Sequence, residues 1–173
     1  DNEFAATQRA WQQRLDVARG KQRAGDILVL AGETPTRALA TEARFQAVFE
    51  NAAVGIALMG LDRRIFSVNA AGQRLTGYTA AELRQIAAPD LAVEADREIG
   101  RDLFEELIAG RRDQYTLEKR YRRKDGSVFW GRVNFSAVRD AAGQARYLVG
   151  LIEDITETKE AAARLAQGDL TQD

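Results

Sequence analysis

Three consecutive segments in the last third of the chain have the residue pattern of β-strands, and tight turns join them. They run over Tyr115–Arg123, Val128–Arg139 and Tyr147–Ile155. The first turn contains Asp125-Gly126, a pair that supplies the positive backbone dihedrals of a short hairpin. The middle strand has apolar residues on both faces, so both faces of the sheet must be at least partly covered. A meander of this kind predicts an antiparallel sheet.

A second hairpin precedes the meander. Gly55–Met59 and Ile65–Val68 have strand character, and Asp62–Arg64 supplies the turn between them. We expect both groups of strands to form a single five-stranded antiparallel sheet in the order 2-1-5-4-3. The segments between the hairpin and the meander would cross one face as short helices. The predicted fold class is therefore α+β.

Helix signals fill the region between the two groups of strands. A short helix is expected after Asn69 and ends at Gly77, which suits the left-handed C-terminal position. Thr79 and Glu82 have the spacing of a capping box at the start of another helix. Apolar residues at every fourth position predict a longer helix over Glu94–Ala109.

Helices are also expected at both ends of the chain. Apolar stripes predict helices over Phe4–Arg23 and from about Thr34 to Asn51, and Thr156–Gln167 is rich in helix formers. The N-terminal helices either cap the main domain or form a signalling helix that dimerises. We divide the chain into an N-terminal extension at 1–36, a main domain at 37–156 and an output helix at 157–173.

Five sequence blocks resemble PAS sensor domains of bacterial signalling proteins, in the same order and with ordinary spacings. The blocks are Phe45–Ile56, Val68–Ala71, Leu75–Leu83, Arg123–Ser127 and Val149–Glu157. The chain departs from the family at Ala88–Leu91, where a His-Pro-Asp-Asp stretch is usual, so loop length and cavity shape there are expected to differ.

The resemblance implies a noncatalytic sensory module that binds a small ligand or senses its state. A change in helix packing would pass to an effector domain in the same chain, such as a kinase or a cyclic-dinucleotide enzyme. The module would act as a homodimer through its terminal helices and sheet face. We expect a cytoplasmic location for this segment, although the parent protein could be anchored in a membrane.

Four residues are candidates for relaying the signal. The resemblance places Asp154 and Thr156 at the junction between the last strand and the output helix. Thr156 suits the N-terminal cap of that helix, and Asp154 suits a contact with a basic or backbone donor. Asn69 is expected to fasten a turn, and Trp130 to cover the outer face of the sheet under a terminal helix. The alternative is that Asp154 and Thr156 only cap a helix.

The absence of Cys and His narrows the choice of cofactor. Without Cys there is no thioether flavin adduct, and without His there is no ordinary haem ligand. We therefore favour either no cofactor or a small, mainly apolar ligand. The residues expected to face it are Ile56, Leu58, Phe66, Leu103, Leu107, Phe135, Val149 and Leu151.

Charge and hydropathy exclude two classes of partner. The net charge is -1, and the one basic cluster, Lys119–Lys124, is interpreted as a solvated outer face of a strand. Nucleic acid binding is therefore not expected. No apolar run approaches the roughly 18 residues of a membrane span, so we expect no membrane contact from this segment.

Two further hypotheses stay open. The domain could be a scaffold that binds another protein through its sheet face and terminal helices, without a small molecule. It could also be an enzyme that uses the carboxylates Asp90, Glu94 and Asp96. Acidic side chains are favoured at helix starts in any case, which weakens the enzyme hypothesis.

Overall fold

The computed structural model describes residues 35–168, so the helix expected over Phe4–Arg23 lies outside the described residues. The chain divides into two compact units, 1–51 and 52–173. In the first unit the described element is α2 (Pro35–Asn51), where the rings of Phe45 and Phe49 stack with centroids 5.6 Å apart.

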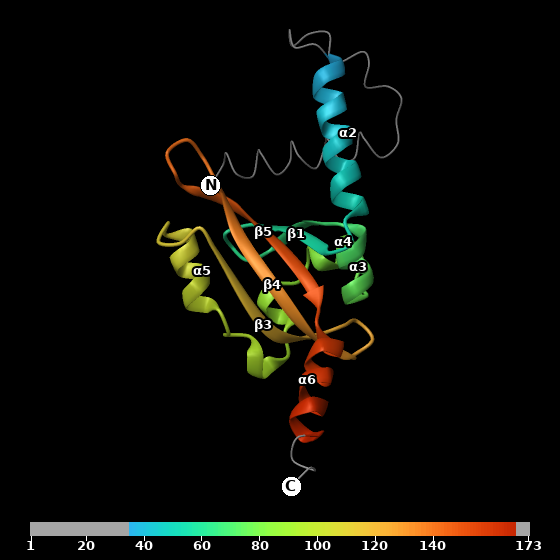
Figure 1. The fold of residues 1–173 in the computed structure, drawn as a ribbon. Helices are drawn as coiled ribbons and strands as arrows, with labels where there is room; N and C mark the ends of the chain where they lie inside the picture. The colour runs from blue at the N-terminus through green and yellow to red at the C-terminus, as the bar shows by residue number, and fades with distance from the viewer. Residues whose placement is uncertain (1–34, 169–173) are drawn as a thin grey trace. The chain divides into compact units, whose positions relative to one another are not determined.

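Over residues 52–168, the second unit contains five strands, with helices between β2 and β3 and one helix after β5 (Figure 1). The elements are β1 (Gly55–Met59), β2 (Ile65–Val68), α3 (Ala70–Thr76), α4 (Ala80–Leu83), the 3-10 turns η3 (Ala88–Leu91) and η4 (Glu94–Asp96), α5 (Arg101–Ile108), β3 (Gln114–Arg122), β4 (Val128–Arg139), β5 (Ala145–Asp154) and α6 (Thr156–Gly168).

The strands form one antiparallel sheet in the order β2-β1-β5-β4-β3, which confirms the predicted topology. The central strand β5 pairs with β1 on one side and β4 on the other, with Gly150 opposite both Ala57 and Phe135. Two buried clusters lie on the inner face, one around Phe129 and Val133 and the other around Leu107 and Leu148. The short helices pack on this face.

The predicted helix over Glu94–Ala109 is wrong at its N-terminal end. Residues Glu94–Asp96 form a separate 3-10 turn, and α5 begins only at Arg101. Gly100 interrupts the helix because its φ of 85° is left-handed, a conformation that glycine adopts without steric cost. The fourth-residue spacing of apolar side chains did not reveal this interruption.

Two of the predicted helix caps are present, and the β3–β4 turn differs from the predicted conformation. Gly77 ends α3 with a φ of 77°, and Thr79 and Glu82 form the full capping box of α4. In the β3–β4 turn only Gly126 has a positive φ, 88°, so Asp125 does not share the left-handed conformation expected for the pair. The Asp125 carboxylate instead accepts hydrogen bonds from the N–H and hydroxyl of Ser127.

Candidate functional site

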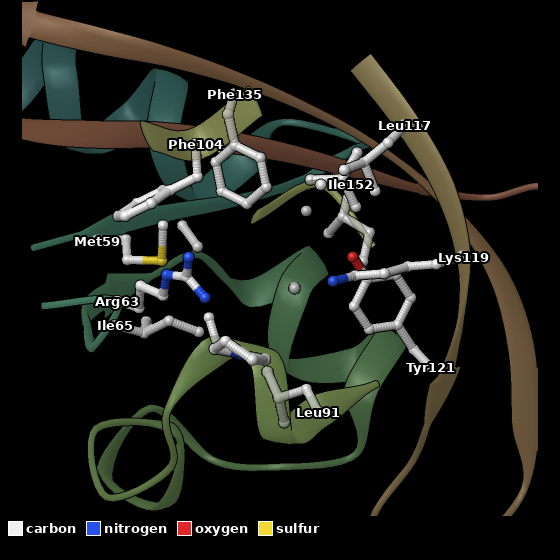
Figure 2. Close-up of a pocket in the computed structure, with 18 of the residues that line it drawn as sticks. Met59, Arg63, Ile65, Leu91, Phe104, Leu117, Lys119, Tyr121, Phe135 and Ile152 are labelled. Carbon is white, nitrogen blue, oxygen red and sulfur yellow. The ribbon is translucent and has the colours of Figure 1, made fainter. Parts of the chain in front are cut away.

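A cavity of about 110 Å³ lies between the inner face of the sheet and the short helices (Figure 2). Strand residues on its wall include Met59 from β1, Leu117 from β3, Phe135 from β4 and Ile152 from β5. Phe104 contributes from α5. Gly150 also lines the cavity, where the ring of Phe135 lies so close that an added Cβ would come within 2.8 Å of it. The wall is therefore mainly apolar.

Two of the eight residues expected to face a ligand line this cavity, Ile56 and Phe135. The other six lie outside the lining: Leu58, Phe66, Leu103, Leu107, Val149 and Leu151. Side chains alternate between the two faces of a strand, and the register of β5 places Leu148, Gly150 and Ile152 on the inner face. The sequence interpretation chose the opposite face of β5.

The remaining four misplaced residues have other surroundings. Leu58 of β1 lies opposite Val149 of β5, and both side chains are on the face of the sheet that points away from the cavity. Leu58 is nonetheless buried. Phe66 makes an edge contact with Tyr147, with ring centroids 5.8 Å apart. Leu107 is fully buried in the second core cluster, and Leu103 packs against that cluster. Of the apolar residues on α5, Phe104 is the one that lines the cavity.

Polar residues in the cavity were missed by the sequence analysis. Arg63, from the β1–β2 turn, and Lys119, from β3, extend their nitrogen atoms towards the cavity from opposite sides (Figure 2). Tyr115 and Tyr121 lie on the same face of β3 as Lys119. The alternation of Tyr115, Leu117, Lys119 and Tyr121 was the signal that could have identified this face.

The basic cluster Lys119–Lys124 is not the solvated outer face that we expected. Lys119 is only 8% exposed. Arg120, Arg123 and Lys124 form ion pairs with Asp96, Asp154 and Glu82. The side chains of the cluster point alternately to the two faces of β3 and into the following turn, so each charge makes a different contact.

Burial shifts the pKa values of several cavity residues. It lowers the pKa of Lys119, and the positive charge of Arg63 lowers it further, while Asp96 and Glu98 act in the opposite direction. Burial raises the pKa of Tyr115 to about 12 and raises the pKa of Tyr121 as well. Both phenols are therefore neutral hydrogen-bonding groups at physiological pH.

Asp154 and Thr156 connect the end of β5 to α6 and to the neighbouring strand. Asp154 accepts hydrogen bonds from the backbone N–H and the hydroxyl of Thr156, at 2.9 and 2.6 Å, and pairs with Arg123 at 2.7 Å. Burial raises the pKa of Asp154, but the Thr156 and Arg123 contacts together hold it below its usual value. The Thr156 hydroxyl accepts from the N–H of Trp130 at 3.0 Å, so its observed contact is to β4 rather than a cap of α6.

Trp130 lies on β4 beside this junction. The ammonium of Lys159 in α6 lies 5.1 Å from the centre of its ring, and the Arg120 guanidinium lies 5.8 Å away. Lys159 also pairs with Glu118 of β3. The contacts agree with the expected position of Trp130 under a terminal helix.

Asn69 fastens the end of β2 to β1. Its side-chain oxygen accepts from the N–H groups of Ile56 and Gly72, at 2.8 and 3.0 Å, and its amide nitrogen donates to the carbonyl of Val54 at 3.0 Å. The residue is completely buried. Its side chain also caps α3, a contact that fastens the turn between β2 and that helix.

The three carboxylates of the enzyme hypothesis have different environments, and that of Glu94 is an exposed position at the start of η4. Asp96 is buried and accepts three hydrogen bonds from Arg120, which hold its pKa at about 2. Asp90 lies 3.8 Å from Arg97. Asp96 therefore remains an ionised structural group that joins η4 to β3. Within residues 35–168, no cluster of three or more acidic, His or Cys side chains is arranged to hold a metal ion.

None of the helices in the described residues is both long enough and apolar enough to span a membrane.

Comparison with known proteins identifies one family. The family model described as the PAS fold matches residues 43–155. The sensor histidine kinase TmoS of Ectopseudomonas mendocina is 34% identical over 128 residues, 74% of this chain. The probable diguanylate cyclase DgcE of Escherichia coli is 34% identical over 119 residues, 69% of this chain. The chain spans only 13% and 11% of these two relatives.

The structure of an RNA-binding light-oxygen-voltage receptor is similar to this fold, with a TM-score of 0.66 and 31% sequence identity. The similarity covers 79% of this chain and 39% of the receptor chain.

Proposed function

The chain belongs to the PAS family, and from this premise we propose that its domain senses a small molecule in the inner cavity and relays occupancy through β5 to α6. PAS domains are sensory modules of signalling proteins and are not themselves catalytic. The observation that carries the proposal is that one strand belongs to both sites. Gly150 and Ile152 of β5 line the cavity, and Asp154 of the same strand forms the junction with α6.

The relay has a direct physical path. A ligand beside Gly150 must contact the Phe135 ring, which packs over that glycine and belongs to the paired strand β4. Movement of β4 against β5 would act on Trp130, whose backbone bonds to both Ile155 and Thr156. Asp154, Thr156, Trp130 and the strand anchor Asn69 are therefore our proposed relay residues.

We propose that the effector domain belongs to the same polypeptide and receives the signal through α6. TmoS is named as a histidine kinase and DgcE as a diguanylate cyclase, and each is much longer than the matched segment. By analogy, the effector is a kinase or a cyclic-dinucleotide enzyme of a bacterial signalling protein. Our working division remains an extension at 1–36, the sensor at 37–156 and an output helix at 157–173, in a cytoplasmic part of the parent.

Native mass spectrometry of freshly purified protein tests ligand binding. We expect a reproducible added mass that disappears in Ala88→Leu, because Ala88 lines the cavity and a larger side chain would fill it. The matched control is Ala87→Leu, since Ala87 is the neighbouring alanine and is outside the lining. Circular dichroism checks that both variants fold. Persistent absence of added mass would favour the ligand-free scaffold instead.

Dimerisation is part of the proposal. Val48 of α2 and Leu165 of α6 are 71% and 74% exposed, and exposed apolar residues on terminal helices suit a homodimer contact. We expect sedimentation to show a dimer at roughly tens of micromolar protein and a shift towards monomer in Leu165→Glu. A wild-type monomer at this concentration would rule out the dimer.

A further inference from the structure

Among the described residues, four cationic side chains line the cavity, and two of them have carboxylate partners. Arg97 lies 3.8 Å from Asp90. Arg101 pairs with Glu98 at 3.1 Å and with Glu105 at 3.4 Å. The charges of these two arginines are therefore balanced by the protein itself.

Arg63 and Lys119 differ from that pair. Within residues 35–168, neither has a carboxylate within ion-pair distance. The Arg63 guanidinium lies 4.3 Å from the centre of the Phe104 ring. The Lys119 ammonium lies 5.7 Å from the Tyr121 ring and donates a long hydrogen bond, 3.5 Å, to the carbonyl of Ile99. Both charges thus face aromatic and backbone groups.

Two such cations in a mainly apolar cavity are electrostatically unbalanced. Lys119 is 8% exposed, so water compensates little of its charge. The two side chains approach the cavity from opposite sides and repel each other (Figure 2). An anion between them would be attracted to both, and the attraction is strengthened where water is excluded.

The size of the cavity limits the rest of the ligand. Its volume of about 110 Å³ is smaller than the ~150 Å³ of an apolar cavity that accepts benzene. A single ring is therefore the upper limit for the apolar body, a short branched chain suits the cavity better, and a flavin or a haem exceeds its volume. The surrounding side chains, such as Met59, Leu117 and Phe135, favour that apolar body.

We infer that the cavity takes a small organic monocarboxylate, with its apolar body against Met59 and Phe135 and its carboxylate between Arg63 and Lys119. The inference rests on the proposed function, because it requires the cavity to hold a ligand. It adds the chemical class of that ligand, which neither the apolar lining nor the family determines.

Calorimetric titration with matched probes tests the inference. The probes are benzoate with its neutral analogue benzamide, and isovalerate with isovaleramide, each up to about 10 mM. We expect at least one carboxylate to bind about tenfold or more tightly than its amide, as charge-assisted hydrogen bonds predict. Arg63→Met and Lys119→Met should each remove most of this preference and leave amide binding within about twofold.

Arg146→Met is the control, since Arg146 lies outside the cavity lining and is paired with Asp140. It should leave the carboxylate preference within about twofold of wild type. An equal loss in Arg146→Met would contradict specific binding between Arg63 and Lys119. Amides that bind as well as carboxylates would overturn the anion inference and keep the ligand-sensing proposal. Binding of none of the probes would overturn the inference, while the native mass measurement would still decide the proposed function.

The stability of Lys119→Met supplies a second readout. An unbalanced buried charge is a cost to the unliganded fold, so we expect the ligand-free melting temperature of this variant to equal or exceed that of wild type. A lysine with a purely structural role would lower the melting temperature when replaced. A marked decrease would therefore contradict the inference.

Discussion

Single buried polar residues hold the hairpin and the β3 edge of this domain in place. Asn69 joins β1, β2 and α3 through one amide group, and Asp96 joins η4 to β3 through one carboxylate. Water cannot take over the hydrogen bonds of either side chain, because both residues are almost completely buried. Their loss would leave backbone or guanidinium groups without partners, which is costly in a protein interior.

Asn69→Ala is expected to lower the free energy of unfolding by about 2–4 kcal/mol, because three hydrogen bonds to Ile56, Gly72 and Val54 are lost. Urea denaturation measures the change. The control Asn51→Ala removes one exposed hydrogen bond to Ala47 and should change stability by less than about 0.5 kcal/mol. Equal effects of the two variants would contradict the anchoring role.

Asp96 makes stability depend on pH. Hydrogen bonds from the side chain and backbone of Arg120 lower its pKa from 3.8 to about 2 in the folded chain. The unfolded chain therefore takes up the proton first as pH falls. The stabilisation is complete above about pH 4 and is lost as the pH falls towards the folded pKa.

Asp96→Asn should lower the free energy of unfolding by about 2 kcal/mol near neutral pH and flatten its decline between about pH 4 and pH 2. Urea midpoints across this range provide the measurement. Asp113→Asn, at an exposed position at the start of the β3 region, is the control and should follow the wild-type curve. An unchanged pH dependence in Asp96→Asn would show that another group is responsible.

At the scale of elements, glycines determine where helices end and how closely strands approach. Gly100 ends the segment before α5, and an added Cβ there would clash with Cδ2 of Leu117. Gly143 in the β4–β5 turn has a similar φ of 80° and no atom within 4 Å of an added Cβ. Alanine substitutions at these two glycines therefore distinguish the cost of backbone strain from the cost of steric crowding.

Gly143→Ala should cost about 1 kcal/mol, the strain of a left-handed residue with a Cβ. Gly100→Ala should cost about 2 kcal/mol, because Leu117 must also turn away. Thermal or urea denaturation compares the two variants. Equal costs would mean that Leu117 adjusts freely, and the shape of the cavity wall beside Gly100 would then be adaptable.

Across the sheet domain, the central strand β5 contributes both to the cavity wall and to the junction with α6. Gly150 of β5 lines the cavity. Asp154, further along the same strand, forms the junction with α6. In Figure 1, α6 continues directly from the end of β5. Loss of the junction should therefore loosen the start of α6.

Asp154→Ala is expected to increase amide hydrogen exchange at the start of α6 several-fold, because Thr156 and Arg123 lose their shared partner. Mass spectrometry of peptides measures the exchange. Asp140→Ala is the control, since Asp140 accepts comparable turn hydrogen bonds from Ala142 and Gln144 at the opposite end of β5. If α6 exchanges as in wild type, the junction does not restrain it.

The sequence alone determined the strands, their antiparallel order, the caps at Asn69, Gly77 and Thr79, and the family. The strands and caps depend on local chemistry, namely turn residues and capping side chains, which act within a few residues. The order of the strands is not local, because β1 pairs with β5 far along the chain, and it was expected from the way a hairpin and a meander combine into one sheet.

Only the tertiary structure decided which face of β5 lines the cavity and where the cations lie. Both faces of this strand carry apolar residues, so alternation could not distinguish Leu151 from Ile152. The choice follows from the register with β1 and β4, which places Gly150 between Ala57 and Phe135. Arg63 and Lys119 approach each other only when a turn and a strand far apart in the sequence fold onto one cavity.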